Sequence, residues 1–243
     1  MVLHPKFEGP RASLDLTHVL YDDSSLFSFL LAVITLTPIL LMASYAALAV
    51  MSREYLILAM WAGQFAGEAL NLVIKHLIKQ ERPIDSIGSG YGFPSSHSQY
   101  MAYFCTFLML HLYFRHRFSS TGSKAVDIIW RLCVYSGLLL WTGLVAYSRY
   151  YLGYHNLHQI FWGLAIGSSL GAFVYTFAQL LPTWYPQSLL GQFKAWLISN
   201  PVSTWVQLRD GWDVWADGGR EGDWIRWKQE WDKRHDRSKV KTG

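Results

Sequence analysis

The chain has 243 residues, of which 51% are hydrophobic and only 16% are charged, against about 25% charged residues in ordinary soluble domains. The apolar residues are concentrated in long runs, which indicates a membrane protein rather than a soluble domain. The net charge of +4 is modest, so the positions of the charges say more than their sum.

Five runs are long enough to cross a bilayer, because about 20 apolar residues in a helix span a hydrocarbon core of about 30 Å. The first has no charge, whereas the second carries Glu68, Asn71 and Lys75. The predicted spans are 26–51, 55–78, 97–114, 128–147 and 157–181. The sequence therefore predicts an all-α fold, a polytopic membrane bundle of five or six helices.

Three parts are expected along the chain: an N-terminal segment (1–25), a transmembrane domain (26–181) and a Trp-rich C-terminal tail (182–243). The first part has no apolar core typical of a cleavable signal, so we expect the first span to remain as an anchor. Residues 189–197 repeat apolar side chains at helical spacing, which suits either an interfacial helix or a helical cap packed on the bundle. The charged stretch 233–243 is predicted to be disordered.

The distribution of basic residues predicts the orientation. Ten of the 21 Lys and Arg follow Pro182, and with five spans the linkers that carry Arg53 and Arg115 lie on the same side as the tail. The positive-inside tendency makes that side cytosolic. The N-terminus and the loops 79–96 and 148–156 then face the opposite side.

Two cations lie at the end of the second predicted span. Lys75 is followed seven residues later by Arg82, whose planar guanidinium suits phosphate oxygens. Lys75 alone is explained equally well by snorkelling to the interface. Asn71 and Glu68, however, share its helix face, and a polar stripe inside a span is costly and usually functional.

A second polar cluster opens the third span with Ser95, Ser96 and His97. Serines at a helix start cap it, and the exposed N–H groups with the helix dipole bind anions. A purely capping role for the serines is compatible with such a site. His97 is suited to donate a proton near neutral pH.

A third cluster joins the fourth and fifth spans. Arg149 and His155 are six residues apart, which allows a tight loop that returns both to one site. Gln159 is one helical turn after His155 and could accept a hydrogen bond from one ring nitrogen, leaving the other as a nucleophile. His158 is the rival imidazole, but it points about 100° away from Gln159 on the helix.

Metal binding is the natural alternative for a site with two histidines. No cluster of Asp and Glu and no HExxH spacing accompanies them, and the surrounding positive charge repels a divalent ion. We therefore expect no metal at this site.

These three clusters resemble the type-2 phosphatidic acid phosphatase (PAP2) superfamily, which includes vanadium haloperoxidases. Its signature is Lys-x6-Arg-Pro, then Pro-Ser-x-His, then Ser-Arg-x5-His-x3-Asp, and all three parts occur in order over about residues 55–181. The resemblance implies that His155 attacks phosphorus and forms a phosphohistidine while His97 protonates the leaving group. It also implies that no cofactor is needed, and that phosphate is bound by Lys75, Arg82, Ser95, Ser96 and Arg149.

Gln159 departs from that signature, because aspartate is usual at its position. A neutral amide orients the imidazole without stabilising its positive charge, so we expect a substrate with a better leaving group, such as a diphosphate. The stretches around Glu68 to Lys75, Tyr91 to Gln99 and Tyr147 to Gln159 resemble the dolichyl diphosphatase family, in which glutamine also replaces the aspartate. The resemblance implies a polyprenyl (dolichyl) diphosphate lipid as substrate and a lumenal site in the endoplasmic reticulum membrane.

The C-terminus ends with lysines third and fifth from the end, Lys241 and Lys239. This spacing is similar to a cytosolic dilysine retrieval signal that coat proteins recognise, and it agrees with a cytosolic tail.

Three alternatives remain at this point. A broader-specificity lipid phosphate phosphatase of the same superfamily would act on phosphatidate or related monoesters. A transporter or channel would place charges near mid-span, whereas here the cations lie at span ends. A lipid-binding protein without activity would not need both histidines.

Overall fold

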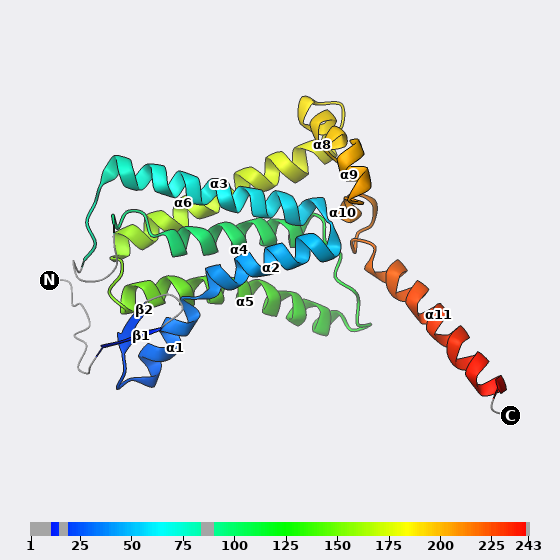
Figure 1. The fold of residues 1–243 in the computed structure, drawn as a ribbon, viewed down its shortest axis with the longest axis horizontal. Coiled ribbons are helices and arrows are strands. Elements are labelled where there is room, and N and C mark those ends of the chain that lie inside the picture. The colour runs from blue at the N-terminus through cyan, green and yellow to red at the C-terminus, as the bar shows by residue number, and fades with distance from the viewer. Residues whose placement is uncertain (1–10, 15–18, 84–89, 242–243) are drawn as a thin grey trace.

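The structure is a computed structural model that describes residues 11–14, 19–83 and 90–241. An antiparallel hairpin, β1 (Arg11–Leu14) and β2 (Val19–Asp22), precedes the helices. The described helices are α1 (Leu26–Ile34), α2 (Thr37–Ser52), α3 (Tyr55–Ile78), α4 (Ser96–Phe114), α5 (Lys124–Tyr151), α6 (Leu157–Tyr175), the π-helical turn η1 (Thr176–Leu180), α7 (Leu181–Trp184), α8 (Leu189–Ser199), α9 (Pro201–Trp205), α10 (Gly211–Val214) and α11 (Arg220–Lys241). Figure 1 shows α2 to α6 running lengthwise, with the hairpin and α1 at one end and α8 to α11 at the other.

Among the described residues, four segments are long and apolar enough to cross a membrane: Leu26–Ser52, Tyr55–Ile78, Lys124–Tyr151 and Leu157–Trp184. The protein is therefore a multi-pass membrane protein. The remaining predicted span, 97–114, forms α4, whose composition is more polar because it begins with Ser96, His97, Ser98 and Gln99. Helices α3, α5 and α6 pack against α4, so its polar residues face protein.

The first predicted span is divided into α1 and α2, which the sequence analysis did not expect. Pro38 has no N–H and cannot donate to the carbonyl of Ile34, four residues before it. The hydroxyl of Thr37 donates to that carbonyl instead, at 2.7 Å. The interruption leaves Thr35, which is 1% exposed, between the two helices.

Helices α4 and α6 approach each other along three glycines spaced four residues apart on α6. A Cβ at Gly163 would lie 2.6 Å from the carbonyl oxygen of Ser95, and one at Gly171 would lie 2.8 Å from that of Tyr103. At Gly167 it would collide with the backbone of Gln99. Small residues at this spacing let two membrane helices touch backbone to backbone.

The C-terminal tail is tied to the bundle by ion pairs. Arg209 contacts Glu54 at 2.7 Å, and Arg115 contacts Asp213 at 2.6 Å. Within the tail, Lys194 of α8 contacts Asp210 at 2.5 Å, with both side chains less than 10% exposed, and its Nζ lies 5.4 Å from the centre of the Tyr55 ring of α3. The other face of α8 exposes Leu189, Phe193 and Trp196. Helix α8 therefore both packs on the bundle and presents apolar side chains outward.

Helix α11 continues through Lys241, so the predicted disorder of 233–241 is wrong; residues 242 and 243 lie outside the described part of the chain. Ion pairs between side chains one turn apart, such as Lys233 with Glu230 at 2.8 Å, stabilise this exposed helix modestly. Lys239 and Lys241 fall in its last turn.

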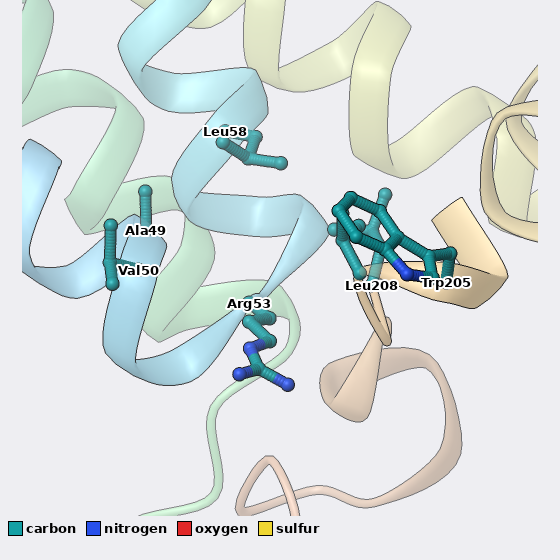
Figure 2. Close-up of a pocket in the computed structure, with 7 residues that line it drawn as sticks. Ala49, Val50, Arg53, Leu58, Trp205 and Leu208 are labelled. Carbon is teal, nitrogen blue, oxygen red and sulfur yellow. The ribbon is translucent and has the colours of Figure 1, made fainter. Parts of the chain in front are cut away.

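A pocket of about 390 Å³ lies where the turn between α2 and α3 meets the tail. Figure 2 shows Arg53 and Trp205 on its rim, and Arg53 donates to Gln207 at 2.6 Å. The lining residues are Ala49, Val50, Arg53, Leu58, Trp205, Val206 and Leu208. Figure 1 shows the turn between α2 and α3 at the end of the bundle opposite the starts of α4 and α6, so the pocket is separate from the candidate site.

The glycine contact generates the first prediction. Gly167→Ala should lower the free energy of unfolding by about 1–3 kcal/mol, because an overpacked interface must shift to make room. Gly137→Ala on α5 is the matched control, since no atom lies within 4 Å of a Cβ there. Thermal unfolding in detergent measures both, and equal stability of the two variants would contradict a direct backbone contact.

Candidate active site

The three polar clusters meet at one end of the bundle. Lys75 lies in the last turn of α3, His97 in the first turn of α4, and Arg149 in the last turn of α5. His155 immediately precedes α6, and Gln159 lies in the first turn of that helix. Segments that are distant in sequence thus converge, as the sequence analysis expected.

Gln159 connects these segments. It is fully buried, and its side-chain Nε2 donates to the carbonyl of Glu81 at 3.0 Å. Its Oε1 faces Nδ1 of His155 at 3.1 Å and the backbone N–H of Asn156 at 3.4 Å. Its own carbonyl accepts from the N–H of Ser95 at 3.1 Å. One residue therefore links the loop before Arg82, the start of α4 and the imidazole.

These partners determine the orientation of the amide. The Glu81 carbonyl can only accept and the Asn156 N–H can only donate, so Nε2 faces the former and Oε1 the latter. Nδ1 of His155 must then donate to Oε1, which leaves Nε2 of the ring with a lone pair. Gly92 lies against this amide, because a Cβ there would be 2.8 Å from Nε2 of Gln159.

His155 is held at the backbone as well. Its N–H and that of Tyr154 both donate to the carbonyl of Arg149, at 3.1 and 3.0 Å. Gly153 in the intervening turn has φ +76, a conformation that favours glycine. The tight loop expected between Arg149 and His155 is therefore present.

The electrostatic setting keeps the His155 ring neutral. The ring is 2% exposed, and burial, followed by the positive charges of Arg149, Arg82 and Lys75, lowers the pKa of His155 to about 3. The hydrogen bond with Gln159 acts in the opposite direction but is outweighed. A neutral imidazole is the form that can attack phosphorus.

Arg149 is almost completely buried, at 4% exposure. Its Nη1 donates to the hydroxyl of Thr35 at 3.3 Å, and its Cζ lies 3.8 Å from the centre of the Tyr154 ring. Its Nε is buried without a hydrogen-bond partner in the described part of the chain. A guanidinium that is oriented by its neighbours and keeps one donor without a partner is suited to an anionic ligand.

Two serines prepare the start of α4. Ser95 is completely buried, and its hydroxyl caps the helix by accepting from the N–H of Ser98 at 3.5 Å and from its hydroxyl at 3.0 Å. Ser96 accepts from Nζ of Lys75 at 3.5 Å. The N–H groups of this helix end and Lys75 therefore lie together, a combination that binds anions.

Arg82 and His97 complete the group. Nε of Arg82 donates to the carbonyl of Gly90 at 3.2 Å, which draws the guanidinium to the returning loop. His97 is partly buried, and Arg149, His155, Lys75 and Arg82 all lie near enough to act on its charge. The second imidazole thus shares the site with the three predicted cations.

His158, the rival imidazole, lies outside this group. It is exposed, accepts from Nε1 of Trp162 at 3.0 Å and stacks on Phe93 with ring centres 5.5 Å apart. This placement agrees with the separation of about 100° expected between His158 and Gln159 on the helix.

Sequence reasoning missed Thr35, Tyr154 and Gly92. Thr35 lies in an apolar run, where only the nearby Pro38 signals an interruption. Tyr154 directly precedes His155 and resembles the many interfacial tyrosines of this chain.

No group of three or more His, Cys, Asp or Glu suited to a metal occurs within the described residues.

Comparison with known proteins shows which family the chain resembles. The family model described as the PAP2 superfamily matches residues 55–182. A protein of Rhinolophus ferrumequinum named dolichyldiphosphatase 1 is 34% identical over 199 residues, which cover 80% of each chain. A dolichyldiphosphatase of Saccharomyces cerevisiae is 38% identical over 167 residues, or 65% of this chain and 66% of its own.

A solved structure shares the fold. It is a transmembrane PAP2-type phosphatidylglycerolphosphate phosphatase from Bacillus subtilis, with a TM-score of 0.51 and 22% identity over 63% of this chain and 77% of that one. The family match covers the segment that contains every sequence-predicted site residue from Lys75 to Gln159. The chain belongs to the PAP2 superfamily.

Proposed function

We propose that the protein hydrolyses dolichyl diphosphate to dolichyl phosphate and phosphate, and so recycles the lipid carrier of protein N-glycosylation. The relatives from Rhinolophus ferrumequinum and Saccharomyces cerevisiae carry the name dolichyldiphosphatase. The observation that carries the proposal is the neutral Gln159 amide, which holds Nδ1 of His155 and so leaves the lone pair on Nε2 of the ring.

The first chemical step follows from that arrangement. Nε2 of His155 attacks the terminal phosphorus, so that a P–N bond forms and the P–O bond to the bridging oxygen breaks. The negative charge of the bound diphosphate favours the protonated form of His97, which gives its proton to the departing dolichyl phosphate. Lys75, Arg82 and Arg149, together with the start of α4, hold the phosphoryl oxygens.

The second step regenerates the ring. His97, now deprotonated, accepts a proton from water as the water oxygen attacks the phosphohistidine. The P–N bond breaks, phosphate leaves, and the electron pair returns to Nε2 of His155. Nδ1 of His155 keeps its proton throughout and donates it in the hydrogen bond to Gln159, so the ring needs no tautomer change.

The substrate class follows from what Gln159 does not supply. An aspartate at this place would stabilise the positive charge that develops on the ring, whereas an amide only orients it. A phosphate is a much better leaving group than an alkoxide and needs less of that assistance. A diphosphate therefore suits this site better than a phosphate monoester such as phosphatidate.

The proposed location is the endoplasmic reticulum membrane, with the site lumenal and the tail cytosolic. Support comes from the basic residues of the tail and of the linkers at Arg53 and Arg115, which favour the cytosolic side. These linkers follow α2 and α4, and Figure 1 shows the ends of α2 and α4 opposite the start of α6. Lys239 and Lys241 would then be accessible to coat proteins as a retrieval signal.

Replacement of the two neighbouring histidines tests the nucleophile. His155→Ala should lower phosphate release from dolichyl diphosphate by at least about 1000-fold, since a lost nucleophile removes the covalent route. His158→Ala is the matched control and should stay within about threefold, because that ring is exposed and bonded to Trp162 rather than to the cluster. The reverse pattern would exclude the assignment.

Gln159→Asp tests the substrate argument. The carboxylate should assist the more demanding monoester, so the ratio of phosphatidate to dolichyl diphosphate hydrolysis should rise by about tenfold. Loss of the amide contact to Glu81 lowers both rates, which is why the ratio within one variant is measured. An unchanged ratio would remove the support for a diphosphate and favour the broader lipid phosphatase.

The low pKa of His155 has a consequence for pH. A group whose pKa falls to about 3 stays neutral above that value and gains a proton only as the pH falls towards it. An imidazole with an ordinary pKa near 6.5 would be about 97% protonated at pH 5. ¹⁵N spectra of histidine-labelled protein, with the signal assigned by its loss in His155→Ala, should show a neutral Nδ1–H ring between pH 7.5 and pH 5. A titration midpoint near 6.5 would contradict the electrostatic assignment.

A further inference from the structure

Arg149 is held by residues from a part of the chain that the family model does not cover. Thr35 lies at the interruption between α1 and α2, and Leu20 lies in β2, both before the matched range 55–182. Each reaches the surroundings of Arg149 through one hydrogen bond. These contacts have no part in the chemical steps above.

The hydrogen bonds around Thr35 form a chain with one possible direction. The hydroxyl of Ser148 donates to the carbonyl of Val145 at 2.7 Å, which uses its only hydrogen. The hydroxyl of Thr35, 2.8 Å from that of Ser148, must therefore donate to it. The oxygen of Thr35 is then left to accept from Nη1 of Arg149 at 3.3 Å.

The direction of these hydrogen bonds matters because the two hydroxyl groups are buried. Thr35 is 1% exposed and Ser148 is 0% exposed, so neither hydroxyl can exchange its partner for water without disruption. The guanidinium thus meets an acceptor that is already oriented. One edge of Arg149 is occupied, and the position of the other atoms is constrained.

Tyr154 fixes the plane of the same guanidinium. Its ring lies under Cζ of Arg149 at 3.8 Å and is 6% exposed. Its hydroxyl accepts from the backbone N–H of Leu20 at 2.8 Å, which anchors the ring to β2. A face contact of this kind restrains tilt, and the Thr35 bond restrains rotation in the plane.

One donor of Arg149 remains without a partner among the described residues. Nε of Arg149 is buried and has no hydrogen-bond partner in the described residues, although Arg82, Lys75 and His155 act in the same region. A buried charged donor without a partner is costly unless a ligand completes it. A phosphoryl oxygen is the complementary acceptor.

We propose that Thr35 and Tyr154 are positioning residues for Arg149, which they hold in the orientation that binds a phosphoryl oxygen. The proposal rests on the function proposed above in one respect, the assignment of Arg149 to substrate phosphate. It adds that α1 and the N-terminal hairpin, through Thr35 and through Leu20 on Tyr154, contribute to the affinity of the site. The alternative is that the Thr35 and Ser148 bond only fastens α1 to α5.

Orthovanadate, a phosphate analogue, is the probe that distinguishes a positioning role of Thr35 from a purely structural one. Thr35→Val keeps the shape of the side chain and removes the hydroxyl. It should weaken orthovanadate inhibition and raise KM, each by about tenfold, which is the range for loss of one hydrogen bond to a charged group. kcat should change less than KM. Thr35→Ser restores the hydroxyl and should return orthovanadate affinity to within about threefold of the wild type.

Thr37→Val is the matched control for stability. Its hydroxyl bonds to the carbonyl of Ile34 and does not touch Arg149, so it should shift the unfolding temperature without changing orthovanadate affinity. A purely structural role for Thr35 predicts the same behaviour for Thr35→Val. Orthovanadate affinity of Thr35→Val within twofold of the wild type would therefore overturn the proposal.

Tyr154 supplies a second test. Tyr154→Leu removes the ring and should weaken orthovanadate binding about as much as Thr35→Val does, whereas Tyr154→Phe keeps the ring face and should weaken it less. In an Arg149→Ala background Thr35→Val should add no further loss, because no guanidinium remains to be positioned. Additive losses in that double variant would also overturn the proposal.

Binding of orthovanadate is measured both as inhibition and as thermal stabilisation of the full-length protein in detergent. A wild-type protein that releases no phosphate from dolichyl diphosphate would refute the proposed function, while stabilisation by orthovanadate would still report on Arg149. An active wild type whose orthovanadate affinity is indifferent to Thr35 and Tyr154 would refute only the present inference. The two failures are therefore distinguishable.

Discussion

The direct contact between the backbones of α4 and α6 is the constraint on which the site depends. Gly163, Gly167 and Gly171 offer no side chain at this contact, so the two helices lie closer than ordinary residues allow. At the end of the contact the N–H of Ser95 reaches the carbonyl of Gln159 at 3.1 Å. The two imidazoles, one at the start of each helix, therefore cannot drift apart without breaking the interface.

Gln159 links this helix contact to the orientation of His155. The same residue that meets Ser95 through its backbone uses its side chain to orient His155 and to hold the loop at Glu81. An aspartate is one methylene shorter and has no N–H to give to Glu81. The amide thus has a structural role that a carboxylate could not fill, in addition to leaving the ring without a neighbouring negative charge.

The sequence predicted the helices and the site to different degrees. The limits of α3, and the convergence of Lys75, His97, Arg149 and His155, could be anticipated, because apolar length and motif spacing are local properties of the chain. The glycine contact was overlooked although its spacing is visible, since glycine is common in membrane helices for other reasons. Thr35 could not be assigned, because its role depends on the distant Ser148, and no local pattern reports a contact across 113 positions.

The N-terminal elements explain how a cation can stay buried beside other cations. Arg149 is 4% exposed and shares its surroundings with Arg82 and Lys75, so the site repels an additional positive charge and lacks a carboxylate bonded to Arg149 in the described residues. A fixed carboxylate would satisfy Arg149 but would compete with phosphate for it. The hydroxyl of Thr35 and the ring of Tyr154 are neutral partners, which restrain the guanidinium and leave its charge available. A buried arginine that is to stay open to an anion needs neutral partners of this type, and here they are supplied or anchored by segments that precede the family match, which begins at residue 55.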